Sequence, residues 1–240
     1  VVVIEIFMVA FVTPGFTAGA ISGEKERKTY EVLRTTLLPA RKLVLGKLTS
    51  ALTYMLLLIL AAVPLQSLAF VLGGVVVQEL ALALIILLVS AFFFAAVGMF
   101  FSSLVRSTLA STILTYVTSL LAVIGLPLVL LILASVVGAF AYDLGGPTSI
   151  PDWVWEIVLI YALILSASLS PITTAVGTEL LLVEEDAIFF YMQRVGYASS
   201  GGVYDIPVVS PWIVYCMLYP ALAFLLVLIA ILLVKRQAKK

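Results

Sequence analysis

Residues 24–47 read EKERKTYEVLRTTLLPARKLVLGK and lie between two long apolar runs. A segment this rich in charge cannot serve as an uninterrupted apolar span, so the stretch predicts a loop. Its Lys and Arg residues outnumber its acids, and short loops with that excess lie on the cytoplasmic side of membranes. Seven of the chain's 13 basic residues fall in this one loop: Lys25, Arg27, Lys28, Arg34, Arg41, Lys42 and Lys47.

The composition predicts an all-α polytopic membrane protein. Hydrophobic residues make up 64% of the 240 residues and charged residues 11%, with a mean hydropathy of +1.27. Soluble domains do not reach these values, and continuous apolar runs favour helices over a β-barrel. The net charge of zero gives no general attraction to nucleic acid. We predict a single transmembrane domain over 1–240, with a cytoplasmic loop at 22–47 and five full spans at about 1–21, 48–72, 79–101, 109–142 and 212–234.

An acidic region follows the fourth span, and it predicts an outer segment at 143–211. The run Trp153–Leu169 is apolar enough to cross, but a full crossing would leave the basic tail 235–240 outside. We therefore predict a re-entrant helix at 153–169 that stops at Ser170-Pro171, with a full extra span as the alternative. A short second helix on the outer surface is expected at Thr178–Met192. The region holds one base, Arg194, and eight acids: Asp143, Asp152, Glu156, Glu179, Glu184, Glu185, Asp186 and Asp205.

Two further expectations concern the spans themselves. The fourth apolar run is ~34 residues long, roughly 50 Å as a straight helix, which exceeds the apolar core of a bilayer. Gly125 and Pro127 lie near its middle and predict a kink or break there. The first span must run inward, and the chain begins with Val1 rather than Met. We therefore expect one further N-terminal span, which would give a six-span plan.

The first half of the basic loop predicts an amphipathic helix at Glu24–Leu38. Ser22 is placed as its N-cap, Glu24 and Lys28 are spaced as an i,i+4 ion pair, and Pro39 ends the helix. An apolar stripe runs along one face through Tyr30, Leu33 and Leu37. From the residues alone, two interpretations stay open: a helix lying on anionic lipid headgroups, or a helix that docks a partner protein.

The loop also carries a motif with recognisable spacing. Gly23-Glu24-Lys25-Glu26 opens it, Thr29-Tyr30-Glu31-Val32-Leu33 follows, and Pro39 and Gly46-Lys47 lead into the next span. In these residues the chain resembles the permease subunits of type-2 ATP-binding-cassette (ABC) exporters. That family usually has Gly directly before the Thr, where this chain has Lys28. Softer likenesses are Ser102–Ser107 after the third span, Ser170-Pro171, and a last span closing on a basic tail.

The resemblance implies the transmembrane subunit of an ATP-driven exporter in the plasma (inner) membrane of a bacterium or archaeon, with a cytoplasmic C-terminus. It implies cytoplasmic ABC ATPase subunits, a second permease copy or paralogue, and membrane lipids as partners. ATP and Mg would bind the ATPase, because Gly46-Lys47 is followed by Leu48 and Arg41 takes the place of the Walker glycine. The helix that docks the ATPase would present Glu24, Glu26, Arg27, Thr29, Tyr30, Glu31, Leu33 and Arg34.

Three polar residues near the outer ends of spans are candidates for a transport path. Glu5 and Glu79 also lie close enough to the interface to reach water, and Gln66, next to Pro64, could instead serve a helix–helix hydrogen bond. The chain has no His, and we predict no catalytic, cofactor-binding or metal-binding residues in it, so the subunit would not be an enzyme by itself. The alternative functions are an intramembrane enzyme, such as a protease or lipid transferase, and a passive channel or scaffold.

Overall fold

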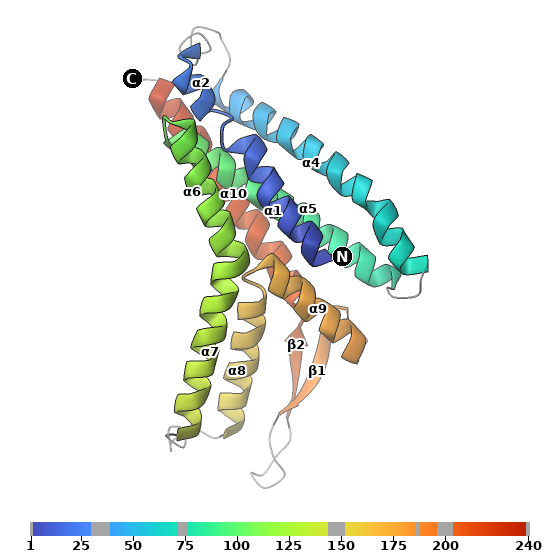
Figure 1. Cartoon of the computed structure of the whole chain (residues 1–240). Helices are drawn as coiled ribbons and strands as arrows, with labels where there is room; N and C mark the ends of the chain where they lie inside the picture. Colours follow the sequence, from blue (N-terminus) through green and yellow to red (C-terminus); the bar gives the residue numbers. More distant parts are fainter. Residues whose placement is uncertain are drawn as a thin grey trace. The chain divides into compact units, whose positions relative to one another are not determined.

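The computed structural model describes residues 2–29, 39–71, 76–143, 152–185, 188–195 and 204–238. Helices dominate these residues, and the few strands form one two-stranded sheet (Figure 1). In chain order the elements are α1 (Val2–Thr17), α2 (Ser22–Glu26), α4 (Ala40–Val71), α5 (Val77–Leu104), α6 (Thr108–Leu120), a π-helical turn (Leu121–Gly125), α7 (Leu126–Asp143), α8 (Asp152–Ala167), α9 (Pro171–Glu185), β1 (Phe190–Val195), β2 (Tyr204–Val209) and α10 (Pro211–Ala238).

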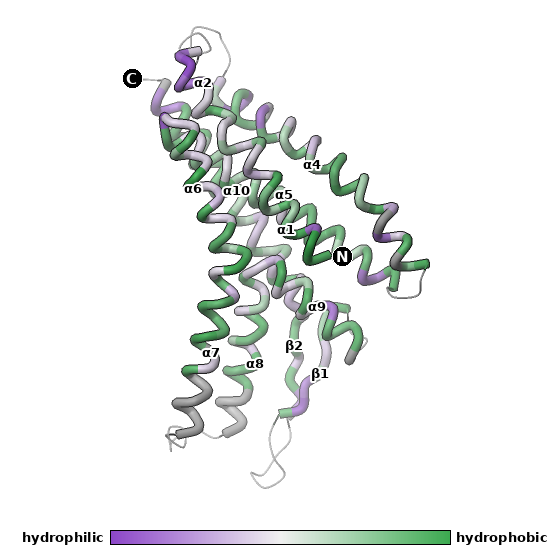
Figure 2. Tube along the Cα trace, in the orientation of Figure 1, coloured by the Kyte–Doolittle hydropathy of each residue, from purple (hydrophilic) through white to green (hydrophobic). Residues whose placement is uncertain are grey.

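Five helical segments in the described part of the chain are long and apolar enough to cross a membrane. This agrees with the prediction of an all-α polytopic membrane protein with five spans, and hydrophobic residues line these helices along most of their length (Figure 2). Two shorter apolar helical segments, Ile157–Ala167 and Pro171–Val183, do not reach that length. The five are Val2–Glu26, Ala40–Leu68, Val77–Leu104, Thr108–Leu133 and Pro211–Gln237.

The second span begins earlier than the prediction of about residue 48. The carbonyl of Pro39 accepts hydrogen bonds from the backbone N–H groups of Lys42 and Leu43 (2.9 and 3.3 Å), so α4 starts at Ala40. A proline immediately before a helix suits this position, because the pyrrolidine ring fixes the backbone and the missing N–H is not needed there. The basic residues Arg41, Lys42 and Lys47 therefore lie on the first turns of a helix rather than in a loop.

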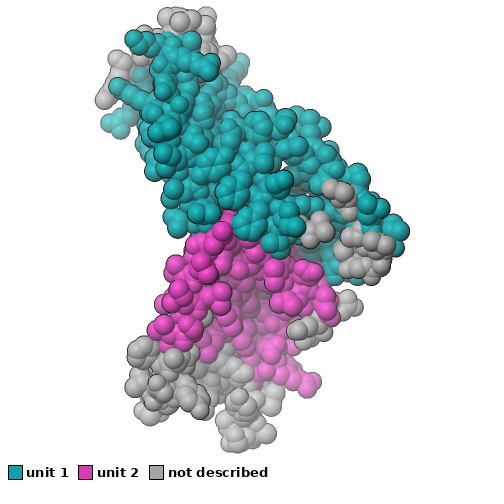
Figure 3. All heavy atoms as spheres, in the orientation of Figure 1, with its two compact units in different colours: residues 1–121, 216–240 teal, residues 122–215 magenta. Residues whose placement is uncertain are grey.

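The chain divides into two compact units, which are described separately (Figure 3). The first comprises Val1–Leu121 and Cys216–Lys240, and α5 is its most enclosed helix, with contacts to α1, α4 and α6. In the most apolar stretch of α5, 61% is buried inside the protein, whereas the buried share of the most apolar stretch of Thr108–Leu133 is 17%. A Cβ added at Gly98 of α5 would lie 2.0 Å from Thr17 Oγ1 of α1. Glycine is therefore what allows these two helices to approach so closely.

The second unit comprises Ala122–Tyr215, and in it α8 contacts α7, α9 and β1. The predicted kink near Gly125 and Pro127 is present as the π-helical turn Leu121–Gly125, after which the helix continues as α7. A π turn leaves backbone groups poorly paired, and here the Ser170 hydroxyl donates to the Val123 carbonyl at 3.1 Å. The Ser170-Pro171 stop predicted from the sequence is also present, because α8 ends at Ala167 and α9 begins at Pro171.

The outer segment differs from the prediction in one element. The helix expected at Thr178–Met192 is wrong beyond Glu185, because α9 ends there and Phe190 begins an antiparallel hairpin of β1 and β2. Exposure alternates along β1, but its sequence Phe-Tyr-Met-Gln-Arg-Val does not alternate in polarity, so the sequence carries no clear strand pattern here. Helix α8 covers 16 residues, fewer than the roughly 20 that a full span needs, which agrees with an incomplete crossing. The re-entrant path of Trp153–Leu169 itself stays a prediction.

Candidate functional site

The candidate site is the end of the first unit where α1 leads into α2. The continuous helix predicted at Glu24–Leu38 is wrong at its start, because α2 ends at Glu26 and Arg27 is its C-cap. Lys28 follows with φ 60°, a left-handed backbone that cannot continue an α-helix. Tyr30, Glu31, Leu33 and Arg34, with the rest of the predicted apolar stripe, lie outside the described residues.

Ser22 does not act as the predicted N-cap. It lies inside α2, and its hydroxyl donates to the Ala18 carbonyl at 3.0 Å. The cap comes instead from α5: the N–H groups of Ile21 and Ser22 donate to Ser102 Oγ at 2.8 and 3.0 Å. All three residues are buried, so these bonds are shielded from water. The end of the third predicted span therefore fixes the start of α2.

Glu24 forms its ion pair with a residue of α4, whereas the sequence predicted a partner on its own helix. Its carboxylate accepts from Lys47 Nζ of α4, rather than forming the predicted i,i+4 pair with Lys28. Lys47 Nζ also donates to the Ala20 carbonyl. The Glu24 and Lys47 side chains are each about a quarter exposed, so this ion pair is screened less than a surface pair. It joins the turn between α1 and α2 to the first turns of α4.

Lys25 caps the end of α5. Its Nζ donates to the carbonyls of Ser102, Ser103 and Val105 at 3.5, 2.5 and 3.4 Å. The last carbonyls of a helix have no partner within the helix and carry partial negative charge, so an ammonium group stabilises them. The Ser103 carbonyl also accepts from Gln237 Nε2, at 3.1 Å, and so brings the end of α10 to the same place.

Glu26 caps the beginning of α6. Its Oε2 accepts from both the backbone N–H of Thr108 at 3.1 Å and the Thr108 hydroxyl. The residue in the N-cap position of α6, Ser107, makes no side-chain cap hydrogen bond. A carboxylate at a helix N-terminus is favoured by both hydrogen bonding and the helix dipole. Sequence spacing could not identify this cap, because the acid comes from a residue 82 positions away.

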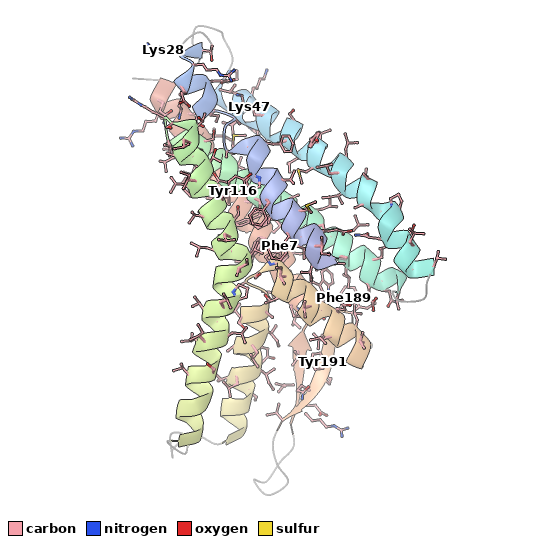
Figure 4. All side chains as sticks on the ribbon, viewed as in Figure 1. Phe7, Lys28, Lys47, Tyr116, Phe189 and Tyr191 are labelled. Carbon is pink, nitrogen blue, oxygen red and sulfur yellow. The ribbon has the colours of Figure 1, made fainter. Side chains whose placement is uncertain are left out.

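These contacts define what we call the α2 joint: Glu24, Lys25 and Glu26 with their partners on α4, α5 and α6. Of the residues predicted to dock an ATPase, Glu24 and Glu26 are engaged within the chain, while Arg27 and Thr29 are exposed. Figure 4 shows Lys28 and Lys47 at this end of the unit. The described basic residues of the first unit lie on or just after α2, on the adjoining ends of α4 and α10, or just after α5: Lys25, Arg27, Lys28, Arg41, Lys42, Lys47, Arg106, Lys235 and Arg236.

The three candidate transport residues belong to the ends of helices away from the α2 joint. The Gln66 amide of α4 donates to the Glu5 carboxylate of α1, so the predicted helix–helix hydrogen bond of Gln66 is present. Glu79 accepts from the backbone N–H of Val76 at 3.1 Å and so caps the start of α5. The structure thus brings Glu5 and Gln66 together and gives Glu79 a local structural contact. A transport role for any of them stays a prediction.

Within the described ranges, no group of three or more His, Cys, Asp or Glu residues could hold a metal ion. No protein-family model matches the chain, and no curated protein matches it. The motif in the loop and the contacts of the α2 joint are therefore what a function can be inferred from. Ser102, which the sequence indicated only as a soft likeness, and Thr108, for which it indicated no role, complete that joint. The sequence feature that could have indicated them is two short Ser/Thr stretches, Ser102-Ser103 at the end of one apolar run and Ser107-Thr108 at the start of the next.

Proposed function

We propose that the chain is the membrane-spanning subunit of an ATP-driven exporter of the type-2 ABC class. In this proposal a separate cytoplasmic ATPase binds α2 and the residues that follow it, and two permease chains together enclose the substrate path. The observation that carries the proposal is the α2 joint. Three consecutive side chains attach one short helix to the beginnings or ends of three membrane-spanning helices.

The joint is suited to transmitting a displacement. Glu24 and Lys47 form a partly buried ion pair, and Lys25 Nζ donates to three backbone carbonyls, so a displacement of α2 would act directly on α4 and α5. Glu26 adds α6 to the same connection. Binding energy from ATP-driven closure of the ATPase pair would shift the equilibrium between two arrangements of these helices. The exposed side chains that could contact the ATPase begin with Arg27 and Thr29, and the Thr29 hydroxyl also donates to the Glu24 carbonyl at 3.3 Å.

The backbone at Lys28 supports the same proposal. The resembled family usually has Gly at this position, and Lys28 has φ 60°, where Gly is the residue without a steric penalty. The backbone at Lys28 therefore has the conformation that the family's usual glycine favours. This agreement is independent of the motif letters, because it concerns geometry at a position where the letters differ.

Co-purification tests the proposal directly. The tagged chain, extracted from its native membranes in mild detergent, should bring down a soluble ATPase. Arg27→Glu combined with Thr29→Asp should release that ATPase, because both side chains are exposed just beyond the joint. Arg236→Glu, on the last turn of α10, is the matched exposed control and should retain it.

Glu26→Ala separates binding from coupling. This variant keeps the exposed residues but removes the cap on α6. The ATPase should still co-purify, while stimulation of its activity by substrate in proteoliposomes should fall. Purification of the wild-type chain without any ATPase would favour an intramembrane enzyme or a passive channel instead. Full stimulation in Glu26→Ala would show that α6 takes no part in the coupling.

A further inference from the structure

The β1–β2 hairpin of the second unit has one exposed face that is mostly apolar. The antiparallel register places Phe190 opposite Val209, Met192 opposite Pro207, and Arg194 opposite Asp205. All six residues are exposed, and Phe190 and Met192 are 62% and 61% exposed. Alternate residues of a strand point to the same face, and residues paired across the two strands share that face, so these six side chains form one continuous surface.

The other face of the hairpin is packed within the unit. Val195 and Val208 are fully buried, and Gln193 and Ile206 are partly buried. On the strand backbone, the hydroxyl of Tyr161 in α8 donates to the carbonyl of Pro207 at 2.7 Å. The hairpin is therefore held to α8 in a fixed orientation. Its apolar face points away from the residues that pack it.

The hairpin is also attached to the first turn of a membrane-spanning helix. Trp212 of α10 donates from Nε1 to the Ile188 carbonyl at 2.8 Å, and its ring lies 5.8 Å from that of Phe189. The N–H of Ser210 donates to the Phe189 carbonyl at 2.9 Å. Tryptophan at the end of a span is typical of the membrane–water interface. Tyr191, labelled in Figure 4, lies on β1, and Phe189, also labelled, lies just before that strand.

Polarity changes along the exposed face with distance from α10. Phe190 and Val209 lie beside the helix start, and the Arg194–Asp205 ion pair lies four residues further along the strands. Four residues of strand span ~14 Å, which exceeds the roughly 5–8 Å thickness of one headgroup layer. The apolar part of the face therefore lies nearest the start of α10, and the charged pair lies farthest from it.

We propose that this face, with the apolar side chains of Phe190, Met192, Pro207 and Val209, lies against lipid at the bilayer surface where α10 begins. The hairpin is a surface anchor that fixes the entry of the last span. Four apolar side chains are few for a protein partner, since a specific protein interface takes about 20–30 residues a side. A two-stranded hairpin is also marginal in water and gains stability from contact with an apolar phase.

Site-directed spin labelling of the full chain in phosphatidylcholine–phosphatidylglycerol nanodiscs tests this. Single cysteines are introduced by Phe190→Cys, Met192→Cys or Arg194→Cys after replacement of the only native cysteine by Cys216→Ser. Collision rates are then measured with oxygen, which partitions into lipid, and with a nickel chelate, which stays in water. Leu228→Cys on an exposed position of α10 provides the lipid-facing reference.

Labels at 190 and 192 should collide more often with oxygen than with nickel, as at 228, and the preference should reverse at 194. That result supports the anchor. Preferential collision with nickel at 190 and 192 would show that the face is in water and overturn it. Low collision with both reagents, accompanied by spin–spin broadening between chains, would show that a second copy covers the face and would likewise overturn it.

Discussion

The α2 joint and the β1–β2 hairpin use charge and apolar surface in opposite ways. In the joint, charged side chains turn inward and satisfy the ends of other helices, as Lys25 does for three carbonyls of α5. In the hairpin, apolar side chains such as Met192 point outward while the ion pair Arg194–Asp205 stands largely exposed. Next to a membrane, the polarity of a side chain therefore does not by itself tell whether it is covered by protein. Charged side chains can turn inward to pair backbone groups at helix ends, and apolar side chains can face outward where lipid covers them.

The largest effect is expected where the joint rests on close helix packing. Gly98→Ala would place a methyl group 2.0 Å from Thr17 Oγ1 and 3.2 Å from the backbone N of Ala18, so α1 and α5 must separate. Overpacking of this kind costs about 1–3 kcal/mol, which thermal unfolding in detergent would register.

Gly46→Ala on α4 is the matched control, because nothing lies within 4 Å of its Cβ position. It should be neutral or slightly stabilising, since Ala favours a helix over Gly. Equal stability of the two variants would show that close packing of α1 on α5 does not support the joint.

The next largest loss of stability is expected from removing the charge of Lys25, which turns inward onto α5. Lys25→Met keeps most of the apolar stem but leaves three α5 carbonyls without their ammonium donor. We expect a loss of about 2 kcal/mol in the free energy of unfolding, the range for hydrogen bonds to charged groups. Lys42→Met, at an exposed position of α4, should change it by less than about 0.5 kcal/mol. Similar losses in both would mean that Lys25 behaves as an ordinary surface lysine.

A stabilising change should come from relieving the left-handed backbone after α2. Lys28→Gly removes the Cβ conflict at φ 60° and should raise stability by about 0.5–1 kcal/mol. Arg27→Gly, where φ is −78°, should instead lower stability, because there Gly only adds freedom to the unfolded chain. The melting temperatures of the two variants should therefore move in opposite directions. Movement in the same direction would contradict the assigned backbone.

The smallest effect is expected at the hairpin's ion pair. A double-mutant cycle with Arg194→Ala and Asp205→Ala should give a coupling energy of at most about 0.5 kcal/mol, because the side chains are 83% and 60% exposed. The same cycle on Glu24 and Lys47 should give a larger value, since that pair is mostly covered. Equal coupling energies, measured at the same salt concentration, would remove the contrast between the two regions.

The sequence predicts the membrane class and the five spans well, because long apolar runs report directly on their surroundings. It also predicts the irregularity before Pro127, since proline's missing N–H acts locally. It misassigns the cap of α2 and does not predict the cap of α6, because Ser102 and Glu26 each act on residues about 80 positions away. The Glu24–Lys28 pair is a sound local expectation that fails once the helix ends at Glu26 and a tertiary partner, Lys47, is nearer. The hairpin is missed because its aromatic and apolar residues suit either a short helix or a strand.

The Ser103 carbonyl has a consequence for how the protein is made. It accepts hydrogen bonds from Lys25, near the beginning of the chain, and from Gln237, 134 residues further on than Ser103 itself. A ribosome adding 5–20 residues per second would need roughly 7–27 s to travel that distance. Throughout that time a nascent chain can have its first helices inserted while this carbonyl still lacks one of its two donors. The last turn of α10 therefore completes the hydrogen bonds of this carbonyl beside α2, and the contact cannot form before residue 237 has been made.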